Sequence, residues 1–137
     1  MITLTPSLDP ADFPQAKDYT PVAPGIYSMK VAALTLEQGP KAYYLNAKFS
    51  HTGEWANRGS VFDNVVVEGA AKFQWARFLA ALGIRESVTI EGDVGQAASF
   101  SINGDSIQLV GRTFDVRLEN GNNPKYNDVA SYLPAKV

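Results

Sequence analysis

Few residues of this chain are of the types that perform acid–base or nucleophilic chemistry. The sequence has one histidine, His51, and no cysteine, which excludes thiolate nucleophiles and metal sites that need thiolates or two imidazoles. His51 lacks an evident carboxylate partner in sequence, and we expect it at the surface of a polar loop. Two acid pairs, Asp115 with Glu119 and Glu91 with Asp93, are of a kind far commoner on solvated surfaces than in catalysis. We therefore expect a protein that is not an enzyme and needs no cofactor or metal.

A second chemistry is better represented, namely flat and cationic side chains at positions expected to face outwards. Proteins that bind single-stranded nucleic acid without reading its sequence follow the phosphates with cations and stack the bases on aromatic rings. Each stacked base contributes about 1–3 kcal/mol, so two or three exposed rings suffice. The candidate residues are Lys41, Tyr44, Lys48, Trp55, Arg58, Phe62, Arg112, Lys125 and Tyr126.

Each candidate also has a purely structural explanation. Phe62 is compatible with packing under the N-terminal segment, Trp55 with anchoring its own loop, and Tyr126 or Tyr132 with the edge of the core. Taken singly, the lysines and arginines resemble ordinary solvated cations. The formal net charge of −2 also argues mildly against nucleic acid, although clustering on one face matters more than the total. The hypothesis rests on the convergence of the set.

Composition limits the protein class. A chain of 137 residues with 45% hydrophobic and 19% charged residues has the length and balance of one globular domain. No apolar run approaches the roughly 18 residues of a membrane span, and the start MITLTPSLDP does not resemble a signal peptide. The absence of cysteine suits a reducing compartment. We expect a cytoplasmic protein without membrane contact.

The chain divides into a proline-rich stretch and a β-rich remainder. Five prolines within residues 1–24 remove backbone donors, so we expect an extended arm that either lies along the barrel or awaits a partner, rather than a packed element. Period-2 alternation predicts strands over 26–36, 41–49 and about 60–67. In the first of them the apolar parity changes near Ala32–Ala33, which predicts a β-bulge.

The apolar period then changes from 2 to 3.6 over residues 68–84, which predicts a helix that ends at Gly83. This helix is apolar on two sides, so we expect residues 86–108 to fold back over the second side. That segment resembles short strands or a hairpin with Asn103–Gly104 as its turn. Two further strands are expected, at 112–118 and near 127–133.

This order of elements predicts a mainly β fold. Three strands, a helix and two more strands are the arrangement of the five-stranded oligonucleotide/oligosaccharide-binding (OB) barrel. We expect the barrel over residues 25–137, with a hairpin-like insertion at about 86–108 and the arm at 1–24. OB barrels bind ligands on strands two and three, between the one–two and four–five loops. On that face we expect Tyr44, Lys48 and Phe62, with Trp55 and Arg58 at one edge and Lys41, Lys125 and Tyr126 at the other.

The sequence also resembles a known family. The stretches PGIYSMKV, RGSVFDNVVV, AKFQWARFLAALGI, GRTFDVRLE and YNDVASYLPA look like the small single-stranded DNA-binding proteins of tailed bacteriophages. Gly111–Arg112 matches the start of that family's fourth strand, and Asn127, Val129, Tyr132 and Pro134 match its closing motif. The resemblance covers most of residues 24–134 and implies an OB fold and a role in phage DNA replication or recombination. The ending SYLPAKV carries no acidic run, so recruitment of repair enzymes by an acidic tail is not expected.

The main hypothesis is therefore sequence-independent binding of single-stranded DNA, in a host-cell cytoplasm if the protein is phage-encoded. Replication or recombination proteins are further expected partners, and the sequence leaves homo-oligomerisation open. The alternative is a structural or adaptor barrel, such as a virion or replisome component, that binds protein through its arm or a sheet edge. A third hypothesis is RNA binding, because the sequence does not reveal how a 2′-hydroxyl is treated.

Overall fold

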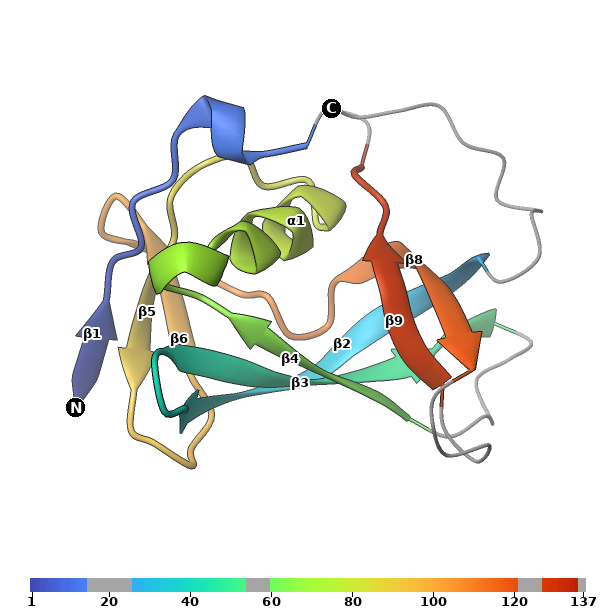
Figure 1. Cartoon of the computed structure of the whole chain (residues 1–137), viewed down its shortest axis with the longest axis horizontal. Helices are drawn as coiled ribbons and strands as arrows, with labels where there is room; N and C mark the ends of the chain where they lie inside the picture. Colours follow the sequence, from blue (N-terminus) through green and yellow to red (C-terminus); the bar gives the residue numbers. More distant parts are fainter. Residues whose placement is uncertain (15–25, 54–59, 121–126, 136–137) are drawn as a thin grey trace.

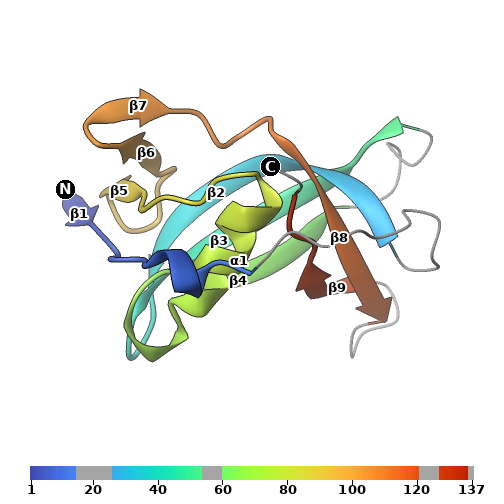
Figure 2. The same ribbon diagram turned by 90° about the horizontal axis from the view of Figure 1, so that it is seen from above.

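Two antiparallel sheets and an α-helix make up the computed structural model, which describes residues 1–14, 26–53, 60–120 and 127–135 (Figures 1 and 2). The larger sheet has the strand order β4-β3-β2-β8-β9, and the smaller sheet has the order β1-β5-β6-β7. The larger sheet comprises β2 (Ile26–Gln38), β3 (Tyr43–His51), β4 (Val61–Val66), β8 (Thr113–Asn120) and β9 (Asn127–Tyr132). The smaller comprises β1 (Ile2–Leu4), β5 (Thr89–Gly92), β6 (Ser99–Ile102) and β7 (Asp105–Ile107). Helix α1 spans Phe73–Ala81.

The five-stranded sheet forms an OB-type barrel. Its edge strands, β4 and β9, lie close together, so that the sheet curls almost into closure (Figure 1). Helix α1 follows the third strand of this sheet in chain order and precedes the fourth. The predicted fold class is confirmed, including the helix between strands three and four and the β-rich insertion before the fourth strand.

Strand β2 contains a β-bulge and also contacts the connection between β5 and β6. Its pairing with β3 shifts register between Val31 and Ala33, which confirms the predicted bulge. Val31 is buried before the shift, and Leu34 and Leu36 are buried after it. An extra residue at the bulge therefore moves the apolar positions to the other parity while keeping them inside. Beyond the bulge, the Leu36 amide donates to the Gln96 carbonyl at 3.0 Å, which joins β2 to the connection between β5 and β6.

Helix α1 covers the interior of the barrel. Trp75 and Phe78 are fully buried, with their rings stacked at a centroid distance of 5.8 Å. Phe78 also meets Phe114 of β8 edge to face, at 6.0 Å. Gly83 has a φ of 81°, a left-handed conformation that ends the helix as predicted. Within the insertion, Phe100 of β6 packs against Trp75 at 6.1 Å.

The first 14 residues are packed, which the sequence did not predict. Strand β1 pairs with β5, with Thr3 opposite Glu91, and the segment after β1 runs alongside α1 in both views (Figures 1 and 2). Leu8 and Phe13 are buried in the core. The expectation of an arm that is not a packed element is therefore wrong for residues 1–14. The prolines remove backbone hydrogen-bond donors, but burial of the apolar side chains between them stabilises the packed segment. Residues 15–24 lie outside the described residues.

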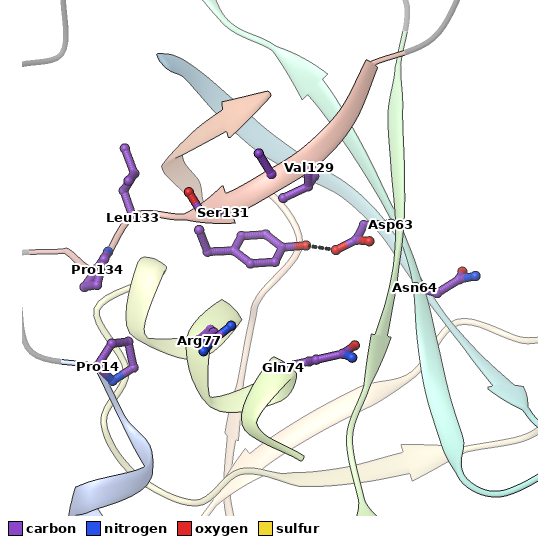
Figure 3. A pocket seen from close by; sticks show the side chains of 11 residues that line it. Pro14, Asp63, Asn64, Gln74, Arg77, Val129, Ser131, Leu133 and Pro134 are labelled. Carbon is purple, nitrogen blue, oxygen red and sulfur yellow. Dashed lines mark hydrogen bonds between the residues drawn. The ribbon is translucent and has the colours of Figure 1, made fainter. Parts of the chain in front are cut away.

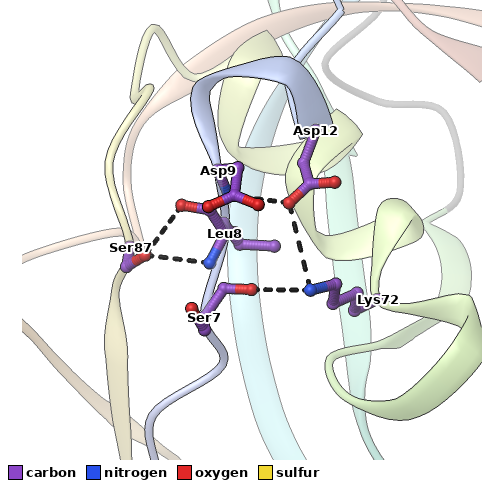
Figure 4. Close-up of polar contacts among 6 residues, drawn as sticks. All are labelled: Ser7, Leu8, Asp9, Asp12, Lys72 and Ser87. Atoms are coloured by element: carbon purple, nitrogen blue, oxygen red, sulfur yellow. Dashed lines mark hydrogen bonds and ion pairs between the residues drawn. The ribbon is translucent and has the colours of Figure 1, made fainter.

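Polar contacts also attach this segment to the chain on either side of α1 (Figure 4). The Leu8 amide donates to Ser87 Oγ at 3.1 Å, and Ser87 Oγ donates back to the Leu8 carbonyl at 3.3 Å. Lys72 Nζ, just before α1, donates to the Ser7 carbonyl at 2.8 Å and lies 4.0 Å from the Asp12 carboxylate. Part of the cover over the helix that we expected from residues 86–108 thus comes from the N-terminal segment.

Two local predictions have opposite outcomes. Asn103 and Gly104 connect β6 and β7 with φ values of 50° and 85°, which confirms the predicted two-residue turn.

His51, in contrast, is the last residue of β3 and is only 5% exposed. Its ring meets Tyr27 edge to face at 5.5 Å. The interpretation of His51 as a surface-loop histidine is wrong, because β3 extends further than its polar sequence indicated.

Candidate nucleic-acid interface

The candidate surface is the side of β3 and β4 that faces away from the core, which we call the outer face. Strict alternation creates it: Leu45, Ala47 and Phe49 of β3 are buried, so the residues between them point outwards. The outer face comprises Tyr44, Asn46 and Lys48 of β3 together with Phe62 and Asn64 of β4.

Pairing of the two strands sets these side chains beside one another. Lys48 lies directly opposite Phe62, whose ring is 50% exposed. Asn46 lies opposite Asn64, and its Nδ2 donates to Asn64 Oδ1 at 3.0 Å. Tyr44 is half-buried at the end of the same row. The structure thus brings Tyr44, Lys48 and Phe62 to one surface, as the sequence predicted for a ligand face.

The remaining candidates are placed differently. Lys41 is exposed in the turn between β2 and β3, at the Tyr44 end of the outer face. Arg112 is exposed, and its Nε donates to the Gln108 carbonyl at 2.7 Å. The Arg112 carbonyl accepts a hydrogen bond from the Val31 amide, at the edge of β2 that lies opposite β3. The structure therefore does not bring Arg112 to the outer face. Trp55, Arg58, Lys125 and Tyr126 lie outside the described residues.

Some neighbouring polar residues were missed by the sequence analysis. Asn46 and Asn64 share the parity of their aromatic and cationic neighbours, so the alternation that identified Lys48 could have identified them too. On β2, Lys30 is exposed opposite Ser50 and adds a positive charge next to β3. Glu37, opposite Tyr44, brings a negative charge to the other end. The surface around the outer face is therefore mixed in charge.

A cleft of about 560 Å³ lies where the barrel closes, and we call it the seam cleft (Figure 3). Its walls come from β4, α1, β9, the residues that follow β9 and the end of the N-terminal segment. The lining residues are Pro14, Asp63, Asn64, Gln74, Arg77, Val129, Ala130, Ser131, Tyr132, Leu133 and Pro134. Across it, the Tyr132 hydroxyl donates a hydrogen bond to the Asp63 carboxylate. The sequence analysis placed Tyr132 at the edge of the core, but it did not pair β4 with the end of the chain.

Burial and the Asp63 carboxylate together keep Tyr132 protonated. Its ring packs against Phe78, at a centroid distance of 5.5 Å, and against Phe49, at 6.2 Å. Burial raises the pKa of the Tyr132 phenol far above its usual value, and the negative charge and hydrogen bond of Asp63 raise it further. The raised pKa favours the protonated phenol, which donates the hydrogen bond to Asp63 at the seam.

Other kinds of site receive no support from the described ranges. No three histidine or acidic side chains within them converge where they could hold a metal ion. No helix in the described part of the chain has the length and hydropathy needed to cross a membrane. Comparisons with models of protein families, with curated proteins and with solved structures found no significant match.

Proposed function

We propose that this protein binds single-stranded DNA without sequence preference across the outer face, and that it acts by binding rather than by catalysis. The observation that carries the proposal is the pair formed by Lys48 and Phe62, a cation and a half-exposed aromatic ring directly opposite each other on adjacent strands. Opposed residues on a sheet have Cβ atoms about 4.5–5.5 Å apart. One nucleotide can therefore stack its base on Phe62 while a neighbouring phosphate approaches Lys48.

The chemistry of the outer face supports recognition without base readout. Every base has a π-face, so stacking on Phe62 or Tyr44 tolerates any sequence. Lysine is a compact charge that follows phosphates without requiring a fixed orientation. Asn46 and Asn64 hydrogen-bond to each other, which leaves them fewer groups for reading base edges.

The net charge of −2 makes local cations decisive. Among the described residues, Lys48, Lys30 and Lys41 are the cations on or beside the outer face that support this binding. Few phosphates are then neutralised, and the logarithm of affinity falls with the logarithm of salt concentration by about 0.7 per phosphate. The resemblance to phage single-stranded DNA-binding proteins extends the proposal to a role in phage DNA replication or recombination in the host cytoplasm.

The proposal is tested by the fluorescence anisotropy of a labelled oligothymidylate titrated with the protein over a series of salt concentrations. We expect saturable binding whose affinity decreases as salt increases, with similar affinity for mixed sequences of the same length. A length-matched RNA oligomer distinguishes DNA binding from RNA binding. Absence of binding at the lowest salt concentration contradicts the proposal and favours the adaptor barrel, which gel filtration and partner capture would then address.

A further inference from the structure

The seam cleft has the size and lining of a small-ligand site. Its volume of about 560 Å³ lies within the range of roughly 300–1,000 Å³ that is usual for such sites. Apolar walls come from Pro14, Leu133 and Pro134, and polar groups come from Asp63 and from helix α1 (Figure 3). Mostly apolar walls with a few convergent polar groups are typical of sites that hold small organic ligands.

Helix α1 supplies the hydrogen-bond donors of the cleft. The side-chain oxygen of Gln74 accepts a hydrogen bond from the Val66 amide at 3.2 Å, so the amide nitrogen of Gln74 remains as a donor group. Arg77 is exposed, and its guanidinium lies 4.9 Å from the centre of the Phe73 ring. This cation–π interaction restricts the orientation of the guanidinium of Arg77, a residue that lines the cleft. Together with the Asp63 carboxylate, the cleft therefore offers both donors and an acceptor.

The seam cleft adjoins the outer face through β4. Asp63 and Asn64 are neighbours on this strand, so their side chains point to opposite sides of it, and Figure 3 shows Asn64 pointing away from the Asp63 side. Asn64 nevertheless lines the seam cleft and also belongs to the outer face beside Phe62. A ligand strand on Phe62 therefore needs only to cross the edge of β4 to reach Arg77.

We propose that the seam cleft holds one nucleotide of the bound DNA strand, with its base against the apolar walls and its phosphate on Arg77. This inference rests on the proposed function and adds a second subsite to it. A base presents both donors and acceptors at its edge, which matches Gln74 and Asp63, and a phosphate matches the cation at the rim. An added peptide strand fits less well, because Gln74 already occupies the Val66 amide on the free edge of β4.

Two variants test the subsite in the full-length chain. Arg77→Gln removes the cation, and Ser131→Tyr places a bulky side chain at an exposed position that lines the cleft. Ser106→Tyr, at an exposed position on β7 of the smaller sheet, is the matched control. We expect both cleft variants to weaken oligothymidylate binding several-fold and Arg77→Gln to reduce the salt slope by about 0.7. The control should bind as the wild type does, and urea unfolding should show that all three variants remain folded.

A mononucleotide titration addresses the cleft separately from the outer face. Thymidine monophosphate added to ¹⁵N-labelled protein should shift the amide signals of Gln74, Arg77 and Ser131, and Ser131→Tyr should abolish these shifts. If Phe62→Ala weakens oligonucleotide binding but neither cleft variant does, and the nucleotide causes no shifts, the subsite is wrong while the proposed function stands. If the wild type binds no oligonucleotide, the proposed function fails and the subsite fails with it.

Discussion

The Tyr132 hydroxyl donates a hydrogen bond to the Asp63 carboxylate and thereby links the last strand of the barrel, β9, to β4 at the opposite edge of the same sheet. No β-ladder joins these two edge strands in the described residues. The contact therefore stands where hydrogen bonds between backbones would close a complete barrel. A bond from a buried phenol to a carboxylate is also stronger than a neutral one.

The first prediction concerns this bond. Tyr132→Phe keeps the ring and its contacts with Phe78 but removes the donor, so the Asp63 carboxylate loses a partner at the edge of the core. We expect the free energy of unfolding to fall by about 1–3 kcal/mol, measured by urea denaturation at neutral pH. Tyr43→Phe is the control, because the Tyr43 hydroxyl makes no hydrogen bond with the described residues. Equal losses in the two variants would show that the seam bond does not stabilise the fold.

The second prediction is a dependence of stability on alkaline pH. Burial and the Asp63 carboxylate raise the pKa of Tyr132 in the folded protein above its ordinary value of about 10, whereas the unfolded chain keeps the ordinary value. Below about pH 10 both states are protonated, so the shift has no effect on stability. Above it only the unfolded state loses the proton, and stability decreases by up to about 1.4 kcal/mol per pH unit from this group. Urea midpoints measured at increasing pH should decline less steeply in Tyr132→Phe than in the wild type; identical slopes would contradict the assignment.

Prediction from sequence worked where the signal is local. The bulge between Val31 and Ala33 follows from a change of parity within one strand, and the Asn103–Gly104 turn follows from the conformations that these two residues tolerate. The row of Tyr44 and Lys48 on β3 follows from strict alternation. Each of these features depends only on residues a few positions apart.

The features that were missed depend on residues distant in sequence. Strand β1 is three residues long and pairs with β5, so its pattern is too short to be recognised alone. Leu8 and Phe13 were hidden among prolines that indicated an unpacked segment. At the seam cleft, Tyr132 hydrogen-bonds to Asp63. Only the closure of the barrel brings these two residues together. Long-range pairing of this kind leaves no periodic signal in a single sequence.

The third prediction concerns the N-terminal segment. Phe13 is 6% exposed and belongs to the core, so Phe13→Ala should lower the free energy of unfolding by about 3–5 kcal/mol. Thr5→Ala, at an exposed position of the same segment, should change it by less than about 0.5 kcal/mol. Urea denaturation of both variants gives the comparison. A wild-type midpoint for Phe13→Ala would restore the view that this segment is an unpacked arm.

The fourth prediction concerns the turn between β6 and β7. A Cβ atom added at Gly104 would meet no heavy atom within 4 Å, so Gly104→Ala tests backbone conformation without a steric clash. Because Gly104 has a φ of 85°, we expect a loss of about 1–2 kcal/mol. Asn103→Gly is the matched change, since glycine adopts positive φ readily, and it should be almost neutral. Thermal unfolding followed by circular dichroism measures both, and a neutral Gly104→Ala would mean that the turn relaxes to another type.

The last prediction addresses the outer face. Phe62 is half-exposed and opposite Lys48, so Phe62→Ala should leave folding stability nearly unchanged while it weakens oligothymidylate binding about five- to a hundredfold, the equivalent of one lost stacking interaction. Lys48→Gln should weaken binding at low salt and reduce the salt slope by about 0.7.

Val94→Ala, which truncates an exposed apolar side chain in the smaller sheet's β5–β6 connection, controls for general surface effects. Fluorescence anisotropy over a salt series separates the two contributions, because stacking lowers affinity at every salt concentration whereas loss of a phosphate contact changes the slope. Wild-type affinity and slope in both Phe62→Ala and Lys48→Gln would exclude the outer face as the DNA-binding surface.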